Sequence, residues 1–150
     1  CAARAWSTWP RPWPISAILA RLRAETPLGQ RGEKLAAKYL RRKGYKIVAK
    51  GDRTGPGELD LVAVVDQTIV FIEVKTRRSS DVGHPAEAVT PDKQRRMTRL
   101  ALAWLKRHRL LESPARFDVV AITWPDDGRS PTIEHYPNAF EAVGKWGFYS

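Results

Sequence analysis

Apolar residues recur with the helical period in two stretches of the chain. The first stretch spans residues 29–43 and is followed by Gly44, a residue that favours the end of a helix. The second spans residues 90–109 and begins with a threonine and a proline, which suit the cap and first turn of a helix. The inward stripe of the first helix carries Glu33 among its apolar residues, and that of the second begins with Gln94.

Short apolar runs between and after these helices predict strands near residues 45–49, 58–65, 69–76, 117–123 and 133–136. The order α-β-β-β-α-β-β predicts an α/β domain in which helices flank a mixed sheet. We expect residues 28–150 to form this single domain. Residues 1–27, with tryptophans spaced among prolines, are expected to form a poorly ordered tail.

Four charged side chains interrupt the second and third predicted strands, although burial of a charge is costly. They are Glu58, Asp60, Glu73 and Lys75. Side chains alternate across a strand, so Glu73 and Lys75 share a face. A turn centred between residues 66 and 67 would place Asp60 directly opposite Glu73, whereas a loop of odd length would shift this register.

Two opposed carboxylates repel each other, and a shared divalent cation is the simplest reason to bring them together. Mg²⁺ takes oxygen ligands and keeps water and substrate phosphate in its shell. Lys75 would then lie beside the cation, where it could orient an attacking water or stabilise charge on a phosphate. The alternative is an ion pair of Lys75 with Asp60 or Glu73, because an E-x-K triplet is common by chance. Glu33 and Gln94 either join this site or are ordinary polar residues near helix starts.

The chain of 150 residues has a net charge of +10 and a pI of about 10.2, which indicates an anionic partner. Nucleic acid is the first candidate, an acidic membrane surface the second, and a basic surface without a partner the third. Its single cysteine, Cys1, excludes an internal disulfide and a Cys-based zinc site. A cytoplasmic location fits this cysteine usage, and no apolar run approaches the ~20 residues of a membrane span.

Basic residues gather on both helices and directly after the third strand. They could follow a phosphate backbone past the acids, although a solvated surface explains any single one of them. The residues expected to contact nucleic acid, including one glutamine, are Arg31, Lys34, Arg53, Arg77, Arg78, Lys93, Gln94 and Arg95.

Five motifs follow one another between about residues 29 and 143. They are GE-x₂-AA-x-YL-x₃-GY, R-x₃-GELDLV, VFIEVKTR, G-x-P-x-EAV-x₃-KQ and RFDVV. In this order they resemble the YraN-type family, uncharacterised protein family 0102. That family is similar in turn to the PD-(D/E)xK nucleases, which include archaeal Holliday junction resolvases and RecB-type nucleases.

The resemblance implies a restriction-endonuclease-like fold and a site that binds Mg²⁺ or Mn²⁺. It implies that Asp60 and Glu73 are metal ligands, that the main-chain carbonyl of Val74 is a further ligand, and that Lys75 is the catalytic lysine. Glu33 matches the helical glutamate of the resolvases, which supports the metal.

The leading hypothesis is therefore a metal-dependent nuclease or nuclease-like protein that acts on DNA, including structured or branched DNA. The main alternative is a non-catalytic nucleic-acid-binding module that keeps the fold and the basic surface. A third reading is a protein of the membrane surface. The sequence leaves open whether the substrate is DNA or RNA and whether the chain forms a homodimer.

Overall fold

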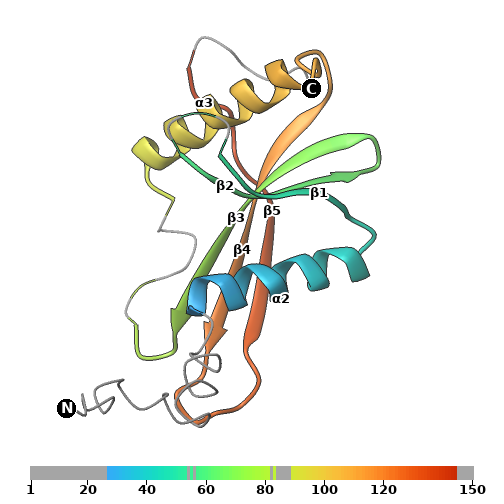
Figure 1. The fold of residues 1–150 in the computed structure, drawn as a ribbon. Helices are drawn as coiled ribbons and strands as arrows, with labels where there is room; N and C mark the ends of the chain where they lie inside the picture. The colour runs from blue at the N-terminus through green and yellow to red at the C-terminus, as the bar shows by residue number, and fades with distance from the viewer. Residues whose placement is uncertain (1–26, 54, 56, 82, 84–88, 145–150) are drawn as a thin grey trace, which may run out of the picture.

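The computed structural model describes residues 27–53, 55, 57–81, 83 and 89–144, so nearly all of the predicted tail lies outside it. A five-stranded sheet has one helix on each face (Figure 1). The elements are α2 (Leu28–Arg42), β1 (Lys46–Asp52), β2 (Leu59–Val65), β3 (Thr68–Arg78), α3 (Pro91–Arg107), β4 (Ala115–Trp124) and β5 (Thr132–Phe140). The predicted α/β class and element order are confirmed.

The strands lie in the sheet in the order β1-β2-β3-β4-β5. Neighbouring strands are antiparallel except β3 and β4, which are parallel because the chain crosses between them through α3. The edge strand β1 carries an irregularity in its pairing with β2 between Ile47 and Ala49.

Several predicted element ends were wrong: β1 was expected to end near residue 49 and extends to Asp52, and two other ends differ for identifiable reasons. The last strand was expected to stop at residue 136, and the next residue is a proline, which cannot donate to a ladder. Instead β5 continues to Phe140 through a register shift opposite residues 117–119, with Asn138 at a φ of 50°. The second helix was expected to reach residue 109, but Arg109 has a φ of 58° and α3 ends at Arg107.

Each face of the sheet packs against one helix, which explains why the central strands are almost continuously apolar. On one face, Ala36, Ala37 and Leu40 of α2 pack on strand residues that include Leu61 and Val70. The other face packs against α3 through the residues Met97, Leu100, Ala101, Trp104 and Leu105. Within the described part of the chain, neither helix has the length and apolar content to cross a bilayer.

The N-terminal half of α2 lies directly against β3. A side chain on Gly32 would have its Cβ only 2.1 Å from Thr76 Oγ1, so only glycine allows this approach. The contact brings the next residue, Glu33, to the part of β3 that carries the E-x-K triplet.

Candidate active site

A tight turn sets the register of the two strands that carry the acids. Asp66 and Gln67 both have positive φ, 46° and 62°, and Val65 pairs with Thr68 across them. The predicted register is therefore confirmed, and the paired backbone continues as far as Leu61 opposite Ile72.

The backbone pairing between β2 and β3 ends at Leu61, the neighbour of Asp60. Beyond that pair, the Asp60 side chain bonds to β3 instead. Its Oδ2 accepts a hydrogen bond from the backbone N–H of Val74 at 2.9 Å. This bond fixes the carboxylate beside β3, close to Glu73. A side-chain hydrogen bond also links Asp60 with Glu73.

Glu73 is the second acid, and two lysines lie against it. Its side chain is only 11% exposed, and Lys75 Nζ lies 3.7 Å from Oε1. The ammonium of Lys93, from the first turn of α3, contacts the same oxygen. The sequence did not predict this pairing of Lys93, because helical spacing alone does not show where the first turn of α3 meets the sheet.

The carboxylates raise one another's cost of ionisation. Burial raises the pKa of Asp60 to about 7, with a further contribution from the charge of Glu73, and the Val74 N–H only partly offsets these effects. The pKa of Glu33 is also raised, mainly by burial and then by the charges of Glu58 and Glu73. The negative charge is thus concentrated where a cation would be stabilised.

The two lysines respond in opposite directions. Burial, followed by the neighbouring Lys93, lowers the pKa of Lys75. Burial also acts to lower the pKa of Lys93, but its hydrogen bond to Glu73 and the charges of Glu73 and Asp60 outweigh this and raise it.

Glu33 reaches the edge of the acid group from α2. It lines a cavity of about 340 Å³ together with Lys34, Lys50, Gly51 and Glu58. Gly51 has a φ of 55°, and a Cβ there would lie 3.1 Å from Glu58 Oε1, so this wall of the cavity depends on glycine. Glu58 had no predicted role, although it interrupts the same apolar run as Asp60.

The donor set suits a hard divalent cation that takes most of its ligands from water and phosphate. Asp60 and Glu73 offer carboxylate oxygens, which Mg²⁺ and Mn²⁺ prefer. Among the residues that the structure describes, however, no three His, Cys, Asp or Glu side chains lie close enough to hold an ion together. The two acids, with a backbone carbonyl such as that of Val74, would therefore hold only one side of the cation.

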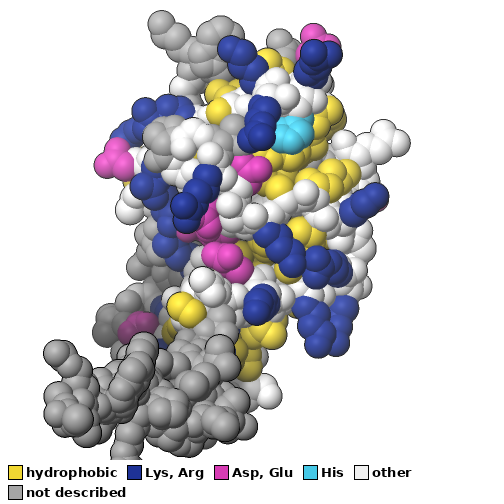
Figure 2. Space-filling model, in the orientation of Figure 1, with side chains coloured by type: hydrophobic (Ala, Val, Ile, Leu, Met, Phe, Trp, Pro, Cys, Tyr) yellow, Lys and Arg dark blue, Asp and Glu magenta, His cyan; other side chains and the backbone are white. Residues whose placement is uncertain are grey.

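Several predicted nucleic-acid contacts lie on the outer surface around this group. Figure 2 shows acidic side chains between the regions of α3 and α2, with Lys and Arg side chains on either side. Lys34 and Arg78 are exposed, and the Arg53 side chain is 82% exposed and pairs with Glu58 at 3.3 Å. The Arg31 guanidinium lies over the Trp124 ring, 4.3 Å from its centroid.

Other predicted contacts, like Arg53 and Arg31, also have partners within the protein. Arg77 donates to the carbonyl of Gly83, and Arg95 pairs with Asp92. The side chain of Gln94 donates to the carbonyl of Val89 at 3.1 Å and borders a cavity beside β5. The structure therefore does not bring Gln94 into the acid group, whereas it does bring Glu33.

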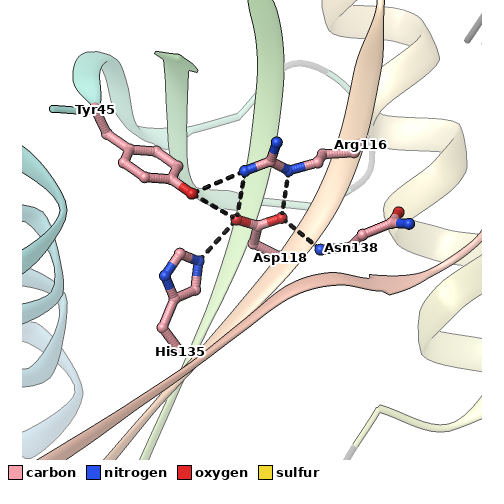
Figure 3. Close-up of polar contacts among 5 residues, drawn as sticks. All are labelled: Tyr45, Arg116, Asp118, His135 and Asn138. Atoms are coloured by element: carbon pink, nitrogen blue, oxygen red, sulfur yellow. Dashed lines mark hydrogen bonds and ion pairs between the residues drawn. The ribbon is translucent and has the colours of Figure 1, made fainter. Parts of the chain in front are cut away.

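A second polar cluster lies on the α2 face of the sheet (Figure 3). Asp118 is fully buried and accepts hydrogen bonds from Tyr45 Oη at 3.5 Å, from Arg116 Nε at 3.0 Å and from the Asn138 backbone N–H at 2.9 Å. His135 Nε2 lies 2.8 Å from the same carboxylate.

Burial of Asp118 acts to raise its pKa, but the bonds from His135, Arg116 and Asn138 lower it overall. These bonds tie β4 to β5 and to the start of β1, which indicates a structural role. A cavity of about 710 Å³ borders Tyr45, Arg116 and Asn138 at the beginning of β3 and β4, and Glu73 does not line it.

Comparisons with known proteins agree with the motif pattern. The family profile described as "Uncharacterised protein family UPF0102" matches residues 32–122. A UPF0102 protein of Rhodopirellula baltica is 46% identical over 142 residues, which cover 93% of this chain and 85% of that protein. A UPF0102 protein of Geobacter metallireducens is 52% identical over 76% of this chain and 92% of its own length. One of Geobacter sulfurreducens is 53% identical over 76% and 88%.

Proposed function

The chain belongs to the uncharacterised protein family UPF0102, the YraN-type group, and we propose that it is a metal-dependent nuclease that hydrolyses phosphodiester bonds of nucleic acid. One observation carries this proposal. The β2–β3 hairpin brings Asp60, Glu73 and Lys75 together on one face, with the Asp60 carboxylate held by the Val74 N–H at 2.9 Å.

In this mechanism Asp60 and Glu73 would hold Mg²⁺ or Mn²⁺, and Glu33 would support the cation through a water. The bound cation would act as a Lewis acid and lower the pKa of a coordinated water. Lys75 orients the attacking water or offsets charge that develops on the phosphate. The basic surface beside the acids holds the phosphate backbone, because lysine and arginine contacts release condensed counterions. Structured or branched DNA is the expected substrate.

The test is cleavage of branched, single-stranded and duplex DNA and RNA by the purified chain with Mg²⁺, Mn²⁺ or a chelator. We expect metal-dependent cleavage that Lys75→Ala reduces strongly while binding persists. Asp60→Ala should lose metal affinity and cleavage together. Arg129→Ala is a matched control, because Arg129 lies in the turn before β5 and pairs with Asp127 outside the acid group. Equal cleavage by the parent chain and both site variants would refute the mechanism.

One observation favours a second function, a nucleic-acid-binding module without turnover. The Lys93 ammonium contacts Glu73, so the acids already have a cationic partner within the chain. Such a module would bind nucleic acid with steep salt dependence and show the same affinity with a chelator as with Mg²⁺. The same cleavage assay, run beside a binding titration, separates the two functions.

A further inference from the structure

Lys93 lies where the acid group meets the basic surface. Its ammonium contacts Glu73 Oε1, and its side chain is 19% exposed. Its backbone is fixed, because the Lys93 N–H donates to the Thr90 Oγ1 cap of α3 at 3.3 Å. The backbone position of Lys93 is therefore constant, while rotation of its four-carbon side chain can redirect the charge.

The balance of charges makes the contact of Lys93 with Glu73 depend on whether a metal is bound. Without a metal, Asp60 and Glu73 are balanced by Lys75 and Lys93, and both ammonium groups lie near the same oxygen of Glu73. A divalent cation bound to Glu73 needs that carboxylate and adds two positive charges beside two ammonium groups. This arrangement is unfavourable unless one lysine finds another anion.

An alternative position for the Lys93 ammonium lies on the outer side of α3. A cavity of about 480 Å³ is lined there by Thr90, Asp92, Lys93, Arg95, Arg96 and Arg99. Three arginines beside one acid give this cavity a positive lining that suits a phosphate group. Lys93 thus borders both the acid group and a place where a phosphate of the nucleic acid backbone would be stabilised.

We propose that Lys93 switches partners, pairing with Glu73 while the site holds no divalent cation and turning to a backbone phosphate in the arginine-lined cavity once a cation is bound. The inference rests on the proposed function, because it requires that Asp60 and Glu73 hold the cation. It makes Lys93 a positioning residue that couples metal binding to nucleic acid binding, so each strengthens the other.

The first test is calorimetric titration of Mn²⁺ into the chain at pH 8 without nucleic acid. Lys93→Met should bind Mn²⁺ roughly tenfold more tightly than the parent, because Glu73 no longer has to release an ammonium. Lys106→Met is the matched control, since it removes the same charge from the exposed last turn of α3 and should leave the affinity nearly unchanged. Circular dichroism checks that each variant folds, and Lys93→Gln replaces the methionine variant if that one does not.

The second test is the salt dependence of binding to a short duplex DNA, measured with Ca²⁺ and with a chelator. With the chelator, the parent and Lys93→Met should have the same slope of log affinity against log salt, because Lys93 is engaged by Glu73. With Ca²⁺, the slope of the parent should be steeper than that of Lys93→Met by about one, the value expected for one added phosphate contact. Lys106→Met should differ from the parent by the same amount under both conditions.

The possible results separate the two proposals. If Mn²⁺ binds the parent and Lys93→Met with equal affinity, and Asp60→Asn abolishes binding, the partner switch is refuted while the metal site stands. If the slopes of the parent and Lys93→Met differ equally with and without Ca²⁺, the switch is also refuted. A parent chain that binds neither Mn²⁺ nor Ca²⁺ refutes the metal-dependent function and, with it, the switch.

Discussion

Replacing Asp60 with asparagine should stabilise the metal-free protein at high pH. The change keeps the shape of the side chain and an oxygen that can accept from the Val74 N–H, while it removes the charge. In the folded protein the pKa of Asp60 is raised from 3.8 to about 7, mainly by burial and then by Glu73. The folded state therefore holds the proton more tightly than the unfolded state, and stability falls as pH rises from about 4 to about 7.

The magnitude follows from that difference in pKa. A change from 3.8 to about 7 corresponds to at most roughly 4 kcal/mol of unfolding free energy at pH 8, and to less than about 1 kcal/mol at pH 4. For a chain of this size, Asp60→Asn should then melt up to roughly 10 °C above the parent at pH 8 in a chelator. The two proteins should melt at nearly the same temperature at pH 4.

The assay is thermal unfolding followed by circular dichroism at pH 4, 6 and 8, with chelator and with Mn²⁺. Mn²⁺ should raise the melting temperature of the parent at pH 8 and have little effect on Asp60→Asn, because the variant lacks one of the two carboxylates. Asp127→Asn, at an exposed ion pair in the turn before β5, is the control for removal of one negative charge. If the parent and Asp60→Asn melt together at every pH in chelator, the Asp60 carboxylate is not held in the environment described.

Three further substitutions test other parts of the structure. Glu33→Gln should raise the Mg²⁺ concentration needed for half-maximal cleavage about tenfold, as expected when a group that supports the metal indirectly is lost, and unchanged metal dependence would remove Glu33 from the site. Gly32→Ala should destabilise the chain by about 1–3 kcal/mol in urea unfolding, because its Cβ would collide with Thr76, and a stable variant would contradict the close approach of α2. Asp118→Ala should cost about 3–5 kcal/mol by leaving Arg116 without its buried partner, whereas Asp81→Ala, at an exposed loop residue, should cost far less.

The sequence was sufficient to predict the hairpin that carries the acids. Alternation along two adjacent strands, together with a two-residue turn, fixes which side chains face each other. The turn itself gave a weak signal, because neither Asp66 nor Gln67 is a glycine although both have positive φ. The apolar alternation on both sides of the turn compensated for this weakness.

The contacts made across longer distances could not be predicted in the same way. Whether Lys93 points to solvent or to Glu73 depends on the angle at which α3 packs on the sheet. The helical period of the apolar residues gives no information about that packing angle. Asp118 lies in an apolar run, and two of its partners, Tyr45 and Asn138, are 73 and 20 residues away in the chain. Only the rule that a buried charge needs several polar partners could have indicated that Asp118 is the centre of a buried cluster.

The hairpin between β2 and β3 also bears on the order of folding events. Asp60 and Val74 are only 14 residues apart, and such hairpins close within about 1–10 μs, whereas the contact of Arg77 with Thr123 on β4 spans 46 residues. The two acids are thus expected to meet before the crossover brings Lys93 against them. Divalent cations present during refolding should then speed the folding reaction itself, in addition to slowing unfolding.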